Sequence, residues 1–230
     1  MKLLTESSGI LGINRPDFVH LNASVKTYAS SVVWIHQPGG TGSGFAIGNN
    51  AVATNRHVVT SEPGGKVIAP RDLRIVSKNG VHTAQSIHLP DWGPDDIAII
   101  ILAEDAKLVP FNIGFSELVE VGERILTLGF PAAHAGAFEE NLYCNVGLVN
   151  RIRPSEFCSE RVLEVSIELQ GGISGAPVLN EMGEVVGLVT FTLTKTQRNQ
   201  EGQMHFERSF HAIPVELLRR LKAKIGTFDE

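Results

Sequence analysis

Short runs of apolar and β-branched residues alternate along this chain with glycine, proline, asparagine and aspartate. The runs occupy residues 31–36, 45–47, 51–54, 73–77, 81–88, 97–102, 124–128, 143–151, 162–169, 176–179 and 185–192. Runs of this length and composition, bounded by turn residues, predict strands. Many short strands at close intervals favour an all-β sandwich or barrel over alternating βαβ units.

Other segments do not follow the strand pattern. Residues 214–226 begin with proline, carry apolar residues at helical spacing and basic residues late, and end in glycine, which predicts a closing amphipathic helix. A short helix is expected over 23–30. Residues 193–208 are polar and lack periodicity, so we predict a long exposed loop there. Residues 1–22 are expected to form an irregular N-terminal arm.

The composition is typical of a globular protein. The 230 residues are 43% hydrophobic and 20% charged, with a formal net charge of −5. This charge gives no reason to expect a nucleic-acid partner, and the basic residues at 219–224 fit the solvated face of the closing helix. The chain has no internal repeat and no low-complexity linker, so a second independent domain is not expected.

Targeting signals and cysteines together indicate a cytoplasmic protein. The first residues lack the apolar stretch of a signal peptide, and the longest apolar run, 97–103, is too short to span a membrane. Cys144 and Cys158 are too few for a disulfide scaffold and fit no zinc pattern. We expect buried free thiols, with a single bridge between them as the alternative.

A serine on a glycine-flanked turn is the most informative motif. Residues 171–177 read Gly-Gly-Ile-Ser-Gly-Ala-Pro and place Ser174 between two strand candidates. A serine becomes a good nucleophile when a base takes its proton and nearby N–H groups hold the resulting oxyanion. Glycines allow the backbone to turn such groups toward one point. The N–H groups of Gly172 and Ser174 are the candidates for this oxyanion hole.

A base and a carboxylate occur upstream of this serine. His57 follows an apolar strand candidate, and Asp95 and Asp96 stand at the start of another. Each of these features alone is more often structural. The order His57, Asp96, Ser174, however, is one of the known arrangements of a catalytic triad. In a triad the imidazole takes the serine proton and the carboxylate orients the imidazole.

These motifs resemble those of trypsin-like serine proteases of the chymotrypsin fold, most closely the protease domain of the HtrA (DegP) family. Residues 54–59 (Thr-Asn-Arg-His-Val-Val) resemble that family's Thr-Asn-x-His-Val-Val, and residues 96–100 resemble its Asp-hydrophobic-Ala strand. Further motifs match in order at residues 121–123, 128–131, 146–149, 174–188 and 210–214. The resemblance covers about residues 24–225.

The resemblance implies a protease domain over 23–225, built as two perpendicular Greek-key β-barrels of six strands. The first barrel would span about 23–115, the second about 116–213, and the closing helix 214–225. Asp96 is preferred to Asp95 because it directly precedes the family's strand, and only one of two neighbours on a strand points inward. The implied activity is a serine endopeptidase that cleaves protein or peptide substrates through an acyl-enzyme, without a metal or other cofactor.

One residue departs from the digestive members of the resembled group. Ile173 stands where they carry an aspartate that pairs with a freshly cut N-terminus. Isoleucine cannot accept an ammonium group, so we expect no zymogen cleavage of that kind. The oxyanion loop would be held by packing, or switched by an activating partner or a loop movement. The PDZ domains typical of HtrA proteins are also expected to be absent, and the oligomeric state is left open.

The resemblance implies substrate-binding residues around a primary pocket, at 168–172, 188–192 and 209–212. Glu168 would favour a basic residue before the scissile bond if it points inward, and a solvent-facing position is the alternative. His211 would neutralise an acidic side chain or, instead, pack under the closing helix. The HtrA resemblance itself implies small aliphatic side chains.

The same resemblance gives roles to one strand of the second barrel. Thr190 would support the Asp96 carboxylate. Thr190, Phe191 and Thr192 would pair with the substrate backbone as an added strand.

Two other patterns carry no chemistry. Residues 40–44 (Gly-Thr-Gly-Ser-Gly) suggest phosphate binding superficially, but they lack the remaining residues of a dinucleotide loop or a P-loop and precede a strand. The histidines at 82, 88, 134 and 205 show no metal-ligand spacing.

Two alternative functions remain open. The chain could be a partner-activated effector protease with few substrates, for example in a bacterial defence system, or a catalytically silent relative that binds peptides. General digestion of casein would favour a housekeeping protease, and clean cutting of one partner would favour the effector.

Overall fold

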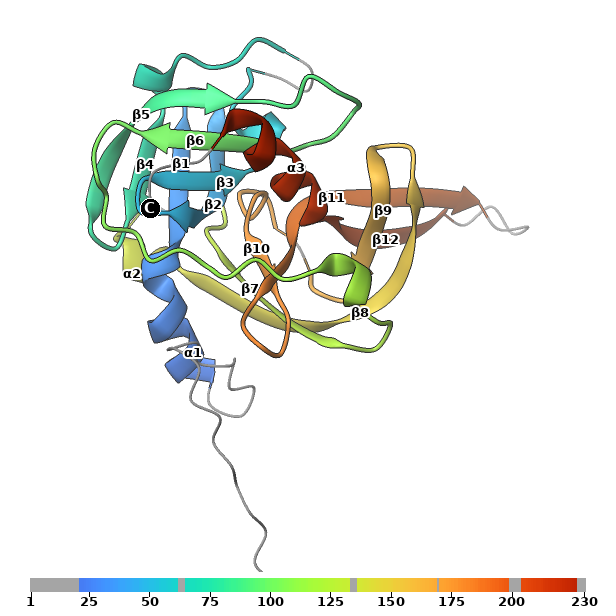
Figure 1. Ribbon diagram of the computed structural model, residues 1–230. Coiled ribbons are helices and arrows are strands. Elements are labelled where there is room, and N and C mark those ends of the chain that lie inside the picture. Colours follow the sequence, from blue (N-terminus) through green and yellow to red (C-terminus); the bar gives the residue numbers. More distant parts are fainter. Residues whose placement is uncertain (1–20, 62–64, 133–135, 169, 199–203, 227–230) are drawn as a thin grey trace, which may run out of the picture.

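Two β-barrels make up most of the molecule. The computed structural model describes residues 21–61, 65–132, 136–168, 170–198 and 204–226. Within these residues the strands close into two six-stranded barrels, joined by a linker over 103–123 (Figure 1). The all-β prediction with two closed barrels is therefore confirmed. Most of the expected N-terminal arm lies outside the described residues.

The first barrel lies in the N-terminal half of the chain. Its strands are β1 (Val32–Gln37), β2 (Gly40–Gly48), β3 (Ala51–Thr54), β4 (Arg74–Ser77), β5 (Gly80–His88) and β6 (Ala98–Leu102). They follow the order β1-β2-β3-β6-β5-β4 around the barrel, and every pair is antiparallel. Because β6 returns to lie beside β3, strands β3 to β6 form a Greek key.

The second barrel repeats this order. Its strands are β7 (Arg124–Gly129), β8 (Tyr143–Ser155), β9 (Cys158–Val165), β10 (Pro177–Leu179), β11 (Val185–Arg198) and β12 (Met204–Pro214). Around the barrel they run β7-β8-β9-β12-β11-β10, which corresponds strand by strand to the order of the first barrel. Each barrel has its own buried core. The core of the first includes Val33, Ile75 and Ile100, and the core of the second includes Ile125 and Leu163.

A third apolar cluster joins the two barrels to the C-terminal helix. It contains Phe45 and Ile97 from the first barrel and Leu188 from the second. The closing helix α3 (Glu216–Ile225) adds Leu217, Leu218 and Leu221, which its helical spacing places on one buried face. Burial of each of these leucines contributes about 1.5–3 kcal/mol to folding. The shared cluster thus holds the barrels in one arrangement.

Helical segments are few. The described ones are α1 (Leu21–Tyr28), α2 (Phe138–Asn141), α3, and the 3₁₀ turns η1 (Ala29–Ser31), η2 (Arg56–Val58), η3 (Pro70–Asp72) and η4 (Ser116–Leu118). The helix expected at the start of the first barrel is present as α1 and η1. Among the described residues, no helix has the length and apolar character needed to cross a membrane.

The exposed loop expected over 193–208 is wrong for most of its length. Strand β11 continues to Arg198 and β12 begins at Met204, and the two pair in regular antiparallel register from Thr192 and Phe210 outward. Together they form a hairpin that projects from the second barrel (Figure 1). Threonine occupies alternate positions of this segment, and β-branched residues are enriched in strands. Residues 199–203 lie outside the described part.

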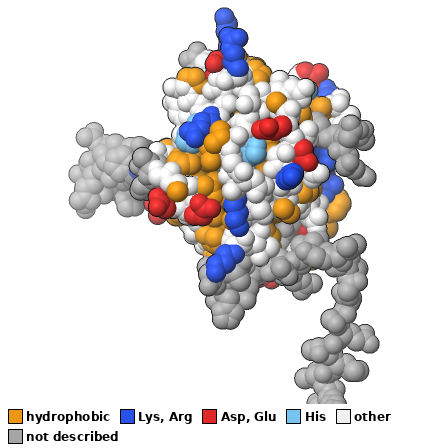
Figure 2. Space-filling model, turned by 90° about the vertical axis from the view of Figure 1, so that its left-hand side faces the viewer, with side chains coloured by type: hydrophobic (Ala, Val, Ile, Leu, Met, Phe, Trp, Pro, Cys, Tyr) orange, Lys and Arg blue, Asp and Glu red, His pale blue; other side chains and the backbone are white. Residues whose placement is uncertain are grey.

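The two cysteines are free thiols, as expected, rather than a bridge, but Cys144 is half-buried and not buried as expected. Cys158 is buried, and this burial raises the pKa of its thiol to about 11. Figure 2 shows one face of the molecule, on which Lys and Arg side chains are interspersed with Asp and Glu and do not merge into a basic surface.

Candidate active site

His57 lies directly after the first barrel's third strand. β3 ends at Thr54, and the chain enters the 3₁₀ turn Arg56–Val58, in which Val58 is buried. Asn55 is fully buried, and its side-chain amide donates a hydrogen bond to the main-chain carbonyl of Asp96 (2.8 Å). The segment that carries His57 is therefore fixed to the segment that carries Asp96.

The carboxylate of Asp96 accepts hydrogen bonds from three donors. His57 contacts it twice, through Nδ1 to Oδ2 (2.7 Å) and through its main-chain N–H to Oδ1 (2.9 Å). The hydroxyl of Thr190 donates to Oδ2 (2.6 Å). Because an ionised carboxylate only accepts hydrogen bonds, Nδ1 carries the proton and Nε2 is left as an acceptor. This is the tautomer that a general base needs.

These contacts also keep Asp96 ionised. Burial by itself would raise the pKa of this carboxyl group. The hydrogen bonds and charge of His57, together with the Thr190 hydroxyl, outweigh that effect and hold the pKa below its usual value.

Asp95 faces a different environment. Its carboxylate is fully buried and accepts hydrogen bonds from Trp92 Nε1 (2.9 Å), the Ser159 N–H (2.7 Å) and the Ser159 hydroxyl (2.6 Å). Neighbouring residues of an extended chain point to opposite sides, as the sequence-based argument assumed. Of the two aspartates, Asp96 is the one that lies against His57.

Ser174 reaches the same place from the second barrel. Its hydroxyl donates a hydrogen bond to the main-chain carbonyl of Thr190 (3.3 Å). Thr190 therefore contacts both Asp96, through its hydroxyl, and Ser174, through its carbonyl. Among the hydrogen bonds of the described residues, none joins the hydroxyl of Ser174 to His57.

The two predicted oxyanion-hole residues, Gly172 and Ser174, lie at the end of one turn. Ile173 N–H donates to the carbonyl of Gln170 (3.3 Å), and Gly172, the third residue of that turn, has a φ of +92°. A positive φ at this position defines a type II turn and favours glycine. Within the described part of the chain, the N–H groups of Gly172 and Ser174 donate to no other group, so both remain able to bind an oxygen atom.

The family model for the trypsin-like peptidase domain matches residues 42–188. The chain belongs to this family. The matched segment includes His57, Asp96 and Ser174.

Solved structures extend the likeness of this trypsin-like peptidase domain to nearly its whole length. A serine-to-alanine mutant of Rv3671c from M. tuberculosis H37Rv, in an inactive form, has a TM-score of 0.65 and 18% sequence identity, covering 96% of this chain and 99% of that one. The Rv3671c protease in an inactive form has the same TM-score and identity, covering 94% and 100%. At this identity the likeness concerns the fold. It does not separate the HtrA proteases from other branches of the trypsin-like peptidases.

The predicted specificity residues are dispersed. Glu168 and Thr192 are exposed, and the side chain of Phe191 lies outside the described part. His211 is fully buried on the barrel face that it shares with Glu164, its partner on β9. Its Nε2 lies 3.0 Å from Nη2 of Arg153 and 3.9 Å from the Glu164 carboxylate. The surroundings of His211 are thus a charged pair rather than an open pocket.

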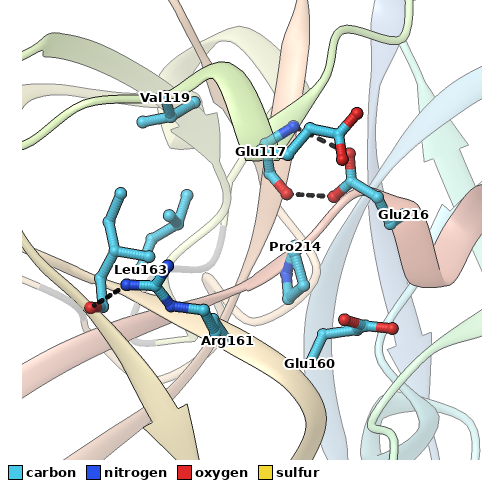
Figure 3. A pocket seen from close by; sticks show the side chains of 9 residues that line it. Glu117, Val119, Glu160, Arg161, Leu163, Pro214 and Glu216 are labelled. Atoms are coloured by element: carbon cyan, nitrogen blue, oxygen red, sulfur yellow. Dashed lines mark hydrogen bonds between the residues drawn. The ribbon is translucent and has the colours of Figure 1, made fainter.

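A cavity of about 210 Å³ lies elsewhere in this peptidase domain, between η4, the β8–β9 hairpin and the start of α3 (Figure 3). Glu216 accepts hydrogen bonds there from the N–H (2.9 Å) and the hydroxyl of Ser116. Arg161 donates to the carbonyl of Ile152 (3.0 Å). None of the predicted site residues lines this cavity, and we assign it no part in the chemistry.

Sequence reasoning missed one residue beside the nucleophile. Ser43 of β2 is fully buried and forms hydrogen bonds with the residues on either side of Ile173. It belongs to the glycine-rich stretch 40–44, whose resemblance to phosphate-binding loops drew attention to the wrong chemistry. A serine between two glycines on a strand was the available signal. Among the described residues, no group of His, Cys, Asp and Glu is arranged to hold a metal ion.

Proposed function

We propose that this chain is a serine endopeptidase in which Ser174, His57 and Asp96 form the catalytic triad. The observation that carries the proposal is the position of Thr190, which binds Asp96 with its hydroxyl and Ser174 with its carbonyl. The acid–imidazole pair of the first barrel and the serine of the second barrel thus meet at one residue.

Substrate binding would complete the triad. The hydrogen bond from Ser174 to the Thr190 carbonyl is long, at 3.3 Å, and therefore weak. A substrate that pairs with Thr190–Thr192 as an added strand would offer its own N–H to that carbonyl. The serine hydroxyl would then turn to Nε2 of His57, its remaining acceptor.

The reaction would proceed by acyl transfer. Oγ of Ser174 attacks the substrate carbonyl carbon while Nε2 of His57 accepts the hydroxyl proton, and the carbonyl electrons move to an oxygen held by the N–H groups of Gly172 and Ser174. When the C=O bond re-forms, the C–N bond breaks and the leaving amine takes the proton from the imidazolium. Water attacks the acyl-enzyme in the same way, giving its proton to His57, and Ser174 regains its hydroxyl.

Packing replaces the ion pair of digestive relatives in holding the oxyanion loop. Ile173 is 1% exposed and lies in the core of the second barrel. An isoleucine here needs no new N-terminus, which supports a loop formed without zymogen cleavage.

The assignment of the nucleophile is tested by labelling with a fluorophosphonate, which reacts with activated serines. Wild-type protein should be labelled, and Ser174→Ala should lose labelling and cleavage of casein while unfolding at a similar temperature.

The chain offers a matched control in a second Ser–His–acid set. The hydroxyl of Ser77 lies 2.8 Å from Nε2 of His82, whose Nδ1 lies 3.6 Å from the Glu104 carboxylate. Ser77 is buried, at 3% exposure, so Ser77→Ala should keep full labelling. Labelling that survives Ser174→Ala, or that is lost only in Ser77→Ala, would contradict the proposal.

A further inference from the structure

Ser43 holds the nucleophile turn from the opposite barrel. It lies in the middle of β2, yet its hydroxyl donates to the carbonyl of Gly172 (2.9 Å) and accepts from the N–H of Phe130 (2.8 Å). Its main-chain N–H donates to the carbonyl of Ser174 (2.8 Å). One fully buried residue of the first barrel therefore binds the carbonyls before and after Ile173 in the second.

The direction of the oxyanion-hole N–H groups depends on such carbonyl contacts. In a trans peptide the C=O and the N–H point in opposite directions, so fixing one fixes the other. Each carbonyl from Gly171 to Ser174 has a donor, and the donors in order are Ala132 N–H (2.7 Å), the Ser43 hydroxyl, Ala176 N–H (3.0 Å) and Ser43 N–H. The donors from Ala132 and Ala176 hold the two peptides that carry the N–H groups of Gly172 and Ser174. Ser43 supplies the other two contacts, to the peptide that follows each of these.

Among these four carbonyls, that of Gly172 depends most on the hydroxyl of Ser43. Among the described residues, the peptide that Gly172 shares with Ile173 is otherwise held only by the long contact from Ile173 N–H to the Gln170 carbonyl (3.3 Å). Two glycines precede this peptide, and glycine resists rotation least. Without the hydroxyl of Ser43, this peptide could turn. It shares the Cα of Gly172 with the peptide that carries the N–H of Gly172, and the Cα of Ile173 with the peptide that carries the N–H of Ser174, so its rotation would disturb both N–H groups.

Glycines around Ser43 allow the backbone of β2 to lie close to the turn that carries Ser174. A Cβ at Gly175 would collide with the carbonyl oxygen of Ser43, and a Cβ at Gly129 would lie 2.8 Å from its hydroxyl. On the strand itself, a Cβ at Gly42 would collide with Val58, and one at Gly44 would lie 2.9 Å from the carbonyl of Ala53. Side chains at these glycines would push the neighbouring segments apart. These close approaches give the glycine-rich stretch 40–44 a physical purpose.

We infer that Ser43 is a positioning residue of the oxyanion hole, and that its hydroxyl holds the Gly172–Ile173 peptide, which links the peptide carrying the N–H of Gly172 to the peptide carrying the N–H of Ser174. This inference rests on the proposed function.

The test is Ser43→Ala, followed with two small probes that need no knowledge of the natural substrate. For p-nitrophenyl acetate, kcat should fall about 10- to 100-fold with KM changed less than about threefold, because the lost contact acts on the developing oxyanion. The rate of fluorophosphonate labelling should fall by a similar factor, since its phosphoryl oxygen enters the same hole. The pH midpoint of kcat/KM should not move, because the contacts of His57 and Asp96 are untouched.

Ser77→Ala is the matched control. Ser77 is also a buried serine of the first barrel, and its hydroxyl contacts His82 and accepts from the N–H of Asn79 (3.0 Å). It should lose stability as Ser43→Ala does and keep its kcat. Ser43→Cys, which retains a weak donor, should fall between wild type and Ser43→Ala in kcat.

Three outcomes would overturn the inference. They are a folded Ser43→Ala with kcat within twofold of Ser77→Ala, a loss of kcat accompanied by a shifted pH midpoint, and a loss confined to KM. If Ser43→Ala does not fold, Ser43→Cys decides, and wild-type kcat in that variant would overturn the inference. An inactive Ser174→Ala beside a fully active Ser43→Ala would leave the triad standing and remove only the role of Ser43.

Discussion

Asp95 and Asp96 are adjacent in the chain, yet they face two different regions of the molecule. Asp96 faces the candidate active site, where the side chain of His57 is 36% exposed and a base can reach a substrate. Asp95 faces a closed contact between the barrels, where Trp92 and Ser159 together donate three hydrogen bonds to its carboxylate. The carboxylate of Asp96 thus contacts a histidine that a substrate can reach, whereas the carboxylate of Asp95 is buried in a structural contact.

The closed region extends to the C-terminal helix. Arg220 of α3 binds Glu160, next to Ser159 (2.5 Å), and its guanidinium lies 5.7 Å from the ring centre of Trp92. Lys224, one turn later, lies 4.6 Å from that ring centre and pairs with Asp91. Asp95 is therefore one part of a contact that ties both barrels to α3. The surroundings of each carboxylate, rather than the residue type, therefore decide which of the two aspartates can support catalysis.

The largest expected effect separates the two aspartates by activity. Asp96→Asn should lower kcat/KM by about 10⁴-fold, because the amide favours the wrong tautomer of His57 while the geometry persists. Fluorophosphonate labelling should slow by a similar factor.

Asp95→Asn sharpens the same comparison from the other side. The amide NH₂ would face the donors of Trp92 and Ser159, and we expect a loss of about 1–3 kcal/mol in the free energy of unfolding with kcat/KM within about threefold of wild type. Chemical denaturation and casein cleavage measure the two quantities. Equal losses of activity in both variants would break the distinction.

A smaller effect is expected at the bridge between Asp96 and Ser174. Thr190→Val removes the hydroxyl that binds Asp96 but keeps the carbonyl that binds Ser174, and His57 still makes both of its contacts with the carboxylate. We expect kcat/KM to fall about tenfold, equivalent to ~1.4 kcal/mol. Thr127→Val, which removes a buried hydroxyl bonded to the carbonyl of Pro177 (2.8 Å), is the control and should leave kcat/KM unchanged. Equal effects of the two variants would show that Thr190 contributes only to packing.

The smallest effect is on acid stability. A carboxyl group whose pKa is lower in the folded state than in the unfolded chain stabilises the fold above its unfolded pKa, about 3.9, and this stabilisation is lost as the pH falls through the folded value. The pKa of Asp96 is lowered by His57 and Thr190 against the effect of burial. Wild-type protein should therefore lose unfolding free energy below about pH 4 that Asp96→Asn does not lose. Parallel denaturation curves for the two proteins from pH 7 to pH 3 would contradict this expectation.

The strands of the barrels were predictable from the sequence because they are short, apolar and bounded by turn residues, and these are local properties. Their closure into two six-stranded barrels was predicted from the family resemblance. The closing helix was predictable for the same reason as the strands, since its proline, spacing and terminal glycine lie within one segment. The extension of β11 and β12 was not, because Thr192 to Arg198 is largely polar and lacks the apolar run of the other strands, so its pairing with residues from Met204 onward leaves little local signal.

The sequence by itself determined the chemistry available to this protein, namely a serine on a glycine turn, a histidine after a strand, and an acid before another. It also determined that one of two neighbouring aspartates would face away from the other. The contact of Thr190 with Asp96 was expected from the family resemblance. Only the tertiary structure decided that the Thr190 carbonyl binds Ser174, that Asp95 meets Ser159, and that Ser43 reaches the turn around Ile173. Each of these contacts joins separate segments of the chain, so no local pattern records it. Those of Asp95 and Ser43 also join different barrels, and they exist only where the packing of the two barrels brings their surfaces within hydrogen-bond distance.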